Sequence, residues 1–255
     1  MTSHDYRVLL TADIENYGSR GDAQQRTLQS GLITAVDTAA DRAGLDRQSW
    51  LRQVGGDSLT AVLPAEPGPL VTIPLLLDQF LTGLDLAIAL HNSRRADPTW
   101  SRMRVRLAVH VGPLFLDGEA GWPGQHAVQP ARLRDSAPIR AALDTFRDAD
   151  LALIISQDVF RDYVSQGPGR PRPSEFLEVA VAEKKQAYQA YLYVPHFDVR
   201  DLELAAPSLS PSGNDAASPQ PSSTIGSIKN RVKGGDVHIA QRDMNVTYDS
   251  KRRGK

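Results

Sequence analysis

The sequence has no cysteine and no long uninterrupted apolar run. Without cysteine there are no disulfides, no zinc–thiolate sites and no cysteine nucleophile, and a cytoplasmic location fits. The longest apolar stretch, Leu75 to Leu90, is broken by charged and amide residues and is too short to span a bilayer. The N-terminus lacks a basic segment followed by an apolar core, so no signal peptide is expected. These features predict a protein that works away from membranes.

The chain also has little net charge. Its 29 Lys and Arg residues nearly balance 30 Asp and Glu residues, which gives a formal charge of -1. This balance provides no general attraction to nucleic acid or to an anionic membrane. A hydrophobic content of 41% and a charged content of 23% are typical of a globular protein. The length of 255 residues fits one domain of ordinary size with an additional segment.

Composition changes sharply after residue 195. Residues 206–223 are rich in serine and proline and cannot bury enough apolar area to offset their ordering entropy. We therefore predict a folded domain at 5–195, a flexible linker at 196–223 and a basic tail at 224–255. Alternating apolar residues within the tail predict a β-hairpin, which is marginal in water by itself and would need a protein partner or self-association. Nucleic-acid contact by the tail is disfavoured, because aromatic residues for base stacking are not interleaved with its basic ones.

Hydrophobic periodicity predicts alternating strands and helices. Strands are expected at 6–13, 49–54, 58–63, 105–111, a return strand through Leu114 and Leu116, 151–155, 178–181 and 187–194. Helices are expected at 23–43, 75–91, 129–143 and 157–164, with a loop at 64–74. Asp22 is a plausible N-cap of the first helix and Gly44 its C′ glycine. The mixed order predicts an α+β sandwich in which helices pack on a largely antiparallel sheet.

Two aspartates stand where predicted strands end. Asp13 follows the apolar run at 8–12, and Asp57 lies in the glycine turn between two apolar stretches at 51–63. Two carboxylates on neighbouring strands can hold divalent metal over a nucleoside triphosphate. The turn at 15–19 leads toward a helix whose N-terminal N–H groups could hold phosphates.

A second pair of motifs, RVRLAVHVG at 104–112 and GWPGQHAVQPARL at 121–133, follows in the sequence. Together with the two aspartates, these segments resemble the class III nucleotidyl (adenylate/guanylate) cyclase homology domain over about residues 5–195. The resemblance is closest to the divergent copies found in bacterial signalling and conflict proteins. It implies a ferredoxin-like, cyclase-type sandwich, a nucleoside triphosphate as ligand, and a homodimer, because class III sites form between two chains.

The resemblance also implies roles for individual residues. Asp13, Asp57 and the carbonyl of Ile14 would hold two Mg²⁺ or Mn²⁺ ions. Arg132 matches the family's helix arginine that acts on the phosphates, and Lys184 is the nearest match to a phosphate-contacting lysine. Asp13, Asp57 and Arg132 would therefore carry the catalysis.

Three positions depart from the family pattern. Gln53 stands where a base-reading lysine is usual, and Gly121 stands at the position of its acidic or threonine partner. Val128 replaces the asparagine that binds the ribose and cannot donate a hydrogen bond. Loss of one aligned donor of this kind typically costs about 10²–10³ in rate. The metal half of the predicted site is therefore intact, and the half that binds base and ribose is not.

The sequence leaves three functions open, and with them the question of whether the chain is an enzyme. The first is regulatory, metal-dependent binding of a nucleoside triphosphate with weak or no catalysis. The second is an active cyclase with unusual base choice, because the amide of Gln53 both donates and accepts. The third is a dimeric adaptor that recruits a partner through residues 224–255.

The segment around the motif at 104–112 also contains a local basic cluster, which includes Arg102, Arg104 and Arg106. Because these arginines alternate with apolar residues, the pattern favours a solvated strand edge.

Overall fold

The computed structural model describes most of the predicted domain and three short strands of the tail. The described residues are 5–94, 96, 99–118, 121–183, 186–202, 229–232, 235–239 and 246–248. The chain divides into two compact units, Met1–Ser208 and Leu209–Lys255. Lys184 lies outside the described residues, so its predicted phosphate contact stays a prediction.

The first unit contains a mixed seven-stranded sheet with the strand order β2-β3-β1-β4-β5-β7-β6. Its strands are β1 Asp5–Ile14, β2 Leu51–Val54, β3 Ser58–Val62, β4 Val105–Leu114, β5 Leu151–Ser156, β6 Leu177–Glu183 and β7 Gln186–Tyr193. Only the pairing of β4 with β5 is parallel, and the other pairings are antiparallel. The predicted α+β sandwich with a largely antiparallel sheet is confirmed.

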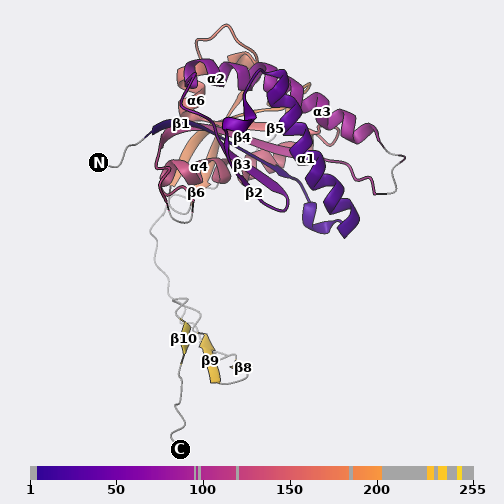
Figure 1. Ribbon diagram of the computed structural model, residues 1–255, viewed down its shortest axis with the longest axis vertical. Coiled ribbons are helices and arrows are strands. Elements are labelled where there is room, and N and C mark those ends of the chain that lie inside the picture. Colours follow the sequence, from indigo (N-terminus) through magenta and orange to yellow (C-terminus); the bar gives the residue numbers. More distant parts are fainter. Residues whose placement is uncertain are drawn as a thin grey trace, which may run out of the picture. The chain divides into compact units, whose positions relative to one another are not determined.

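Helices cover both faces of this sheet. They are α1 Asp22–Arg42, α2 Pro69–Leu75, α3 Leu81–Ser93, α4 Gln125–Arg134, α5 Ala137–Thr145 and α6 Gln157–Val159. The turns between them are η1 Tyr17–Ser19, η2 Arg47–Ser49, η3 Leu76–Phe80, η4 Phe160–Val164, η5 Pro173–Glu175 and η6 Val199–Asp201. In Figure 1, α2, α3 and α6 lie above the sheet and α4 lies below it.

Strand alternation divides the core between the two faces, since successive side chains point to opposite sides. On β4, Leu107 and Val109 join the larger core with α1 and α3, whereas Ala108 joins the second core with α4 and α5. A third, smaller cluster forms on the α4 side around Leu9 and includes Trp122. Trp122 is therefore a packing residue within the described core.

The helix predicted at 75–91 is longer than expected at its N-terminal end. Residues 69–74, predicted as a loop because of their prolines, are helical. Pro69 stands in the first turn, where its missing N–H costs nothing. Pro74 stands inside the helix, and the ladder widens to a π-turn at Leu76–Phe80 directly after it. A π-turn accommodates such a local disruption of the hydrogen-bond ladder.

The combined helix Pro69–Ser93 is the one helix among the described residues that is long and apolar enough to cross a membrane by length and composition, with a mean hydropathy of 1.6. Its inner face packs into the larger core through Ile73, Phe80, Leu84 and Ile88. A core helix passes the same test, so this is weak evidence for a membrane span.

Three further predictions about local structure were wrong. No return strand follows β4 within the described residues 115–118; instead β4 itself continues through Pro113 to Leu114, paired with the start of β1. The helix predicted at 129–143 is two helices, α4 and α5, separated at Asp135 and Ser136. Ser136 begins the second helix with an extended backbone, and Pro138 stands in its first turn. Asp22 is the first residue of α1 rather than its N-cap, which is Gly21, while Gly44 has the positive φ of 66° expected of a C′ glycine.

The folded unit extends past residue 195. Val199 and Leu202, which the sequence assigns to the linker, are buried in the second core. In the other unit, β8 Lys229–Val232, β9 Gly235–Ile239 and β10 Val246–Tyr248 form an antiparallel sheet in the order β10-β9-β8. The predicted hairpin falls on β9 and β10, and its partner-binding role stays a prediction.

One buried side chain on the α4 side of β4 is titratable and unusually shielded. His110 is 3% exposed. Burial, with a smaller contribution from the charge of His126, lowers the pKa of His110 to about 3. The folded protein therefore keeps this imidazole neutral across the range in which the unfolded chain protonates it.

This difference predicts acid destabilisation. Because the folded pKa is depressed, the unfolded chain binds an additional proton as the pH falls from 6.5 toward 3, and the free energy of unfolding falls with it. Between pH 7 and pH 5 the contribution of His110 is about 2 kcal/mol. Urea unfolding at both pH values should show this loss in the wild type and a smaller loss in His110→Asn. The control is His196→Asn, whose ring is exposed, and an equal loss in all three proteins would contradict the assignment.

Candidate functional site

The site is built around the end of β1. Asp13 is paired in register with Arg106 of β4 on one side and with Ser58 of β3 on the other. Its carboxylate points to the α4 side of the sheet, together with Thr11, and it is 5% exposed. A carboxylate at this depth requires charged or hydrogen-bonding partners.

Arg106 supplies the main partner. Its Nε donates to Oδ1 of Asp13 at 3.0 Å and its Nη2 to Oδ2 at 2.5 Å, so both carboxylate oxygens accept a guanidinium bond. This bidentate geometry is the strongest arrangement available to an arginine and a carboxylate. Burial raises the pKa of Asp13, while the charges of Arg106 and Arg134 act in the opposite direction.

Arg134, at the end of α4, brings a second cation to the same carboxylate. Its Nε lies 3.9 Å from Oδ2 of Asp13, and its Nη1 donates to Oγ1 of Thr11 at 3.1 Å. Asp135 holds the guanidinium from outside at 2.8 Å. Although burial lowers the pKa of Arg134, the hydrogen bond to Asp135 and the charges of Asp13, Asp135 and Asp57 raise it overall.

The turn between β2 and β3 places Asp57 beside Asp13. The backbone N–H of Ile14 donates to the carbonyl of Asp57 at 2.9 Å. The structure therefore brings Asp13, Ile14 and Asp57 together, as the sequence predicts. Asp57 is half-buried.

The two residues predicted to read the base also meet. Gly121 has a φ of 122°, and a Cβ built on it would lie 2.9 Å from Nε2 of Gln53, so the Gln53 amide rests on the glycine backbone. Gln53 is paired in register with Thr60, whose hydroxyl lies 3.0 Å from that of Thr11. A polar stripe thus crosses the sheet from Gln53 to the Asp13 centre.

The predicted ribose and phosphate residues lie on α4. Val128 is 44% exposed, and Arg132 follows it by four residues on the same helical face, half-buried. The arginines that pair with Asp13 are Arg106 and Arg134, and neither was predicted from the sequence as a site residue. The only sequence signal of Arg134 was its place one residue past the predicted motif.

The solvated strand edge expected for the arginine cluster is wrong. Arg102 pairs with Asp150 at 2.7 Å, and Arg104 pairs with Glu15 at 2.7 Å. Arg104 also donates to the carbonyls of Ala149 and Phe146. These two side chains lie just before the start of β4, where neighbouring strands and loops supply acids and carbonyls. They are partly buried and paired rather than fully solvated.

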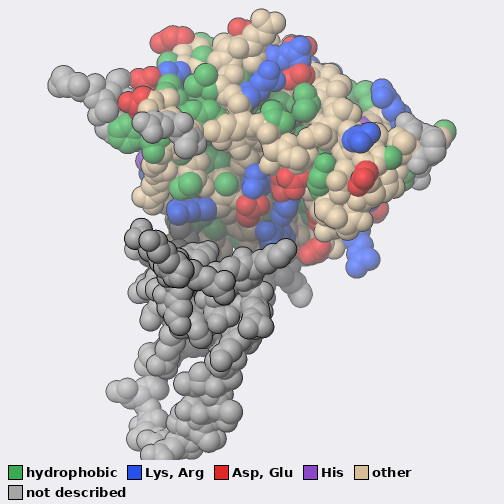
Figure 2. Space-filling view, turned by 60° about the horizontal axis from the view of Figure 1, so that its bottom comes forward, with side chains coloured by type: hydrophobic (Ala, Val, Ile, Leu, Met, Phe, Trp, Pro, Cys, Tyr) green, Lys and Arg blue, Asp and Glu red, His purple; other side chains and the backbone are tan. Residues whose placement is uncertain are grey.

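The outer surface has no comparable concentration of one charge on the face shown in Figure 2. Among the coloured residues there, basic and acidic side chains lie next to one another and are interspersed with hydrophobic ones.

Known proteins resemble this chain in fold rather than in sequence. No protein-family model matches the chain, and no curated protein matches it. Solved structures of class III cyclase domains do match. The guanylyl cyclase Cya2 has a TM-score of 0.52 at 12% identity, covering 76% of this chain and 92% of that one. The adenylyl cyclase CyaB from P. aeruginosa has a TM-score of 0.51 at 13% identity, covering 76% and 95%.

A bacterial light-regulated adenylyl cyclase matches with a TM-score of 0.52 at 12% identity, covering 78% of this chain and 56% of that one. At these identities the likeness concerns the fold. The folded unit therefore has the fold of the class III adenylyl and guanylyl cyclase domains.

The pairing of Asp13 with Arg106 is expected to stabilise the fold. Arg106→Met leaves a buried carboxylate with one weaker partner, and loss of one member of a buried pair costs about 3–5 kcal/mol. Urea unfolding measures this loss. Arg161→Met, which removes an exposed ion pair with Asp162, is expected to leave the free energy of unfolding nearly unchanged. The double variant Asp13→Leu/Arg106→Met should recover part of the loss, and no recovery would contradict the pairing as its cause.

Proposed function

We propose that this chain binds a nucleoside triphosphate in a signalling or regulatory role, with weak or no cyclase catalysis. The observation that carries the proposal is the Asp13 centre, in which two guanidiniums meet one carboxylate at the end of β1 on a cyclase-type fold. The backbone of Asp57 lies next to it, and the charge of Asp57 acts on Arg134. Arginine forks match the geometry of phosphate oxygens, and an anionic ligand would compete with Asp13 for them.

The donor atoms fit a divalent cation that arrives with the triphosphate. The described residues contain no cluster of three His, Cys, Asp or Glu side chains that could hold a metal ion alone. Mg²⁺, however, is commonly held by one or two carboxylates together with substrate phosphates. Asp13, Asp57 and the Ile14 carbonyl would hold Mg²⁺ or Mn²⁺ in this way. When bound, such an ion neutralises phosphate charge and makes a hydroxyl more acidic.

Binding would require an exchange of partners at Asp13. Both oxygens of this carboxylate accept from Arg106. Transfer of the Arg106 guanidinium to a phosphate would release the carboxylate, while Arg134 remains anchored by Asp135 and Thr11. Asp57, which is half-buried in its turn, is the other candidate metal ligand.

We expect weak catalysis because of the residue at the predicted ribose position. Val128 presents an aliphatic side chain where the resemblance expects an asparagine. In a site that depends on such a donor, its loss costs about 10²–10³ in rate.

A homodimer is part of the same proposal. Leu51 on β2 and Val128 on α4 are 46% and 44% exposed on the α4 side of the sheet. Their burial against a second copy would remove apolar surface from water. This would also bring α4 of one protomer toward the triphosphate site of the other.

The proposal requires metal-dependent binding of a nucleoside triphosphate. Asp57→Ala is expected to weaken nucleoside triphosphate binding in Mn²⁺ by about 10-fold or more, since it removes a charged ligand group. Titration calorimetry with each of the four ribonucleoside triphosphates, with Mn²⁺ and with chelator, measures this effect. Asp144→Ala, an exposed aspartate on α5, is the matched control. Equal binding by all three proteins, or no binding by the wild type, would overturn the proposal.

An active cyclase with unusual base choice is the second candidate, favoured by the contact of Gln53 with Gly121. Mass spectrometry of the same mixtures for cyclic product separates it from the first. In either case Gln53→Ala is expected to weaken the preferred nucleotide by about 10-fold and the others by less, because one base-reading amide is lost. Arg52→Ala, whose side chain pairs with Asp37, should leave the order of preference unchanged. An unchanged order in Gln53→Ala would remove Gln53 from base selection.

A further inference from the structure

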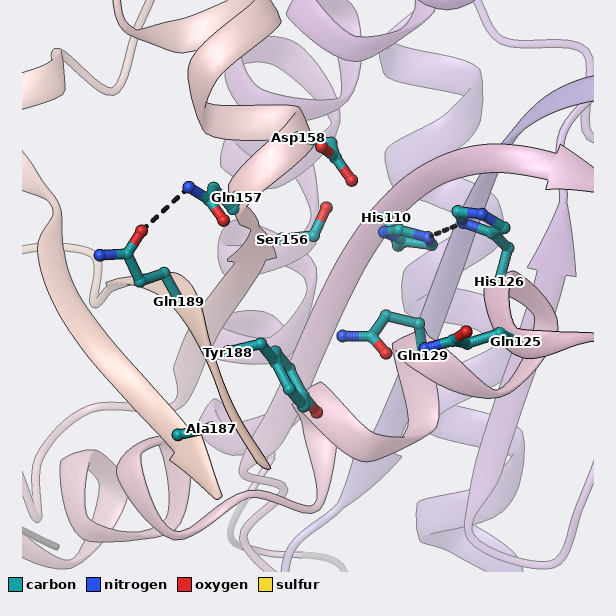
Figure 3. Close-up of a pocket in the computed structure, with 10 residues that line it drawn as sticks. All are labelled: His110, Gln125, His126, Gln129, Ser156, Gln157, Asp158, Ala187, Tyr188 and Gln189. Atoms are coloured by element: carbon teal, nitrogen blue, oxygen red, sulfur yellow. Dashed lines mark hydrogen bonds between the residues drawn. The ribbon is translucent and has the colours of Figure 1, made fainter. Parts of the chain in front are cut away.

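A polar pocket lies on the α4 side of the sheet, away from the Asp13 centre. Its volume is about 290 Å³. It is lined by His110, Gln125, His126, Gln129, Ser156, Gln157, Asp158, Ala187, Tyr188 and Gln189. Figure 3 shows the β4 and α4 residues on one side of it and the residues at the end of β5, the start of α6 and β7 on the other.

The pocket is separate from the Asp13 centre along the same strand. Arg106 and His110 lie on one face of β4, four residues apart, which corresponds to about 13 Å. No residue of the Asp13 centre lines the pocket among the described residues. The two sites can therefore be tested independently.

A buried histidine anchors the pocket wall. One nitrogen of His110, Nε2, lies 2.9 Å from Nδ1 of His126. The other, Nδ1, is buried and has no hydrogen-bond partner among the described residues. In Figure 3 this second edge of the ring is turned toward Ser156. A buried polar atom without a partner costs free energy, which a ligand atom would recover.

The histidine pair is held in place by the backbone. A Cβ at Gly112 would lie 2.1 Å from Nδ1 of His126, so the His126 ring occupies the space that only a glycine leaves. The two rings are nearly parallel, with an interplanar angle of 8°. Because a neutral imidazole has one donor and one acceptor nitrogen, the tautomer of His126 decides whether Nδ1 of His110 donates or accepts.

The charges at the pocket disfavour an anion. The ten lining residues include no lysine or arginine, and their one carboxylate is Asp158, which pairs with Arg161 at 3.0 Å. Burial keeps His110 neutral by lowering its pKa. Among the described residues of the lining, a phosphate or carboxylate ligand would therefore meet no compensating cation.

The uncharged polar groups define the ligand class instead. Four of the lining residues are glutamines, of which Gln157 donates to Gln189 at 2.9 Å. Gln125 and Gln129 supply amides on the opposite wall, and Tyr188 supplies an aromatic surface beside Gln129 (Figure 3). Carboxamides match ligand edges that carry a donor next to an acceptor. The volume suits a small molecule of one or two rings.

We propose that this pocket binds a small, uncharged, planar ligand with amide-type edges, the chemical class of free nucleobases and nucleosides, with Nδ1 of His110 as its buried contact. The site is distinct from the proposed triphosphate site and does not depend on it. Its preference is opposite, because the Asp13 centre offers cations and the described residues that line this pocket offer none.

The test uses the full-length protein and titration calorimetry with adenosine, guanosine, cytidine and uridine, each compared with its 5′-monophosphate. At least one nucleoside is expected to bind with a dissociation constant of about 1 mM or below. Its monophosphate should bind at least about 10-fold more weakly, because the described lining of the pocket includes no cation for the added charge. Gln129→Ala, a half-buried position whose change favours the helix, should weaken nucleoside binding about 10-fold.

Two control variants make the outcome specific. Gln48→Ala, an exposed glutamine on η2, and Asp57→Ala should both bind the nucleoside as the wild type does. The ¹⁵N resonance of His110 Nδ1 should shift on nucleoside addition. The proposal is overturned if no nucleoside binds, if the monophosphate binds equally well, or if Asp57→Ala abolishes binding while Gln129→Ala retains it. Loss of triphosphate binding alone in Asp57→Ala would bear only on the Asp13 centre.

Discussion

The pairing of Asp13 with Arg106 is the constraint on which the candidate site depends. A carboxylate that is almost fully buried at the end of a strand is stable only with a matched partner. Arg106 reaches it because β1 and β4 pair in a register that sets the two residues opposite one another. A shift of one residue in that register would turn one of the side chains to the other face of the sheet. The pairing thus couples the chemistry of the site to the alignment of the central strands.

The other arginines near Arg106 are held by ion pairs as well. Arg104 and Arg102 each pair with an acid from another segment, Glu15 and Asp150 respectively. The start of β4 is therefore flanked by a series of ion pairs, of which the one at Asp13 is the most buried. What distinguishes the Asp13 pair is the additional cation, Arg134, and the adjacent turn that carries Asp57. Two guanidinium groups at one point can form hydrogen bonds to the oxygens of a phosphate, and this is the basis of the proposed triphosphate binding.

Helix α4 links the two sites on this side of the sheet. Its N-terminal half places His126 and Gln129 against a pocket lined mainly by uncharged polar groups, and its last residue, Arg134, reaches the Asp13 centre. Between them Val128 is exposed on another face of the helix. One short helix therefore contributes to two chemically opposite environments, because successive residues of a helix face different directions.

The sequence by itself determined the order and type of most elements, and it identified Asp13 and Asp57 as the two carboxylates of the candidate site. Apolar alternation and strong caps are local signals, so β1, α1, β5 and β7 could be read from them. It also paired Asp13 with Asp57 and Gln53 with Gly121 by resemblance, and the structure places each pair together, while their roles remain predictions.

The start of the 69–93 helix was predicted wrongly as a loop, because Pro69 falls in the first turn of the helix and a π-turn follows Pro74. Only the tertiary structure decided that Arg106 and Arg134 hold Asp13 and that His110 meets His126. These contacts, like that of Arg134 with Thr11 across 123 positions of the chain, depend on strand register and on the placement of α4 over the sheet, and they leave no periodic pattern in the sequence.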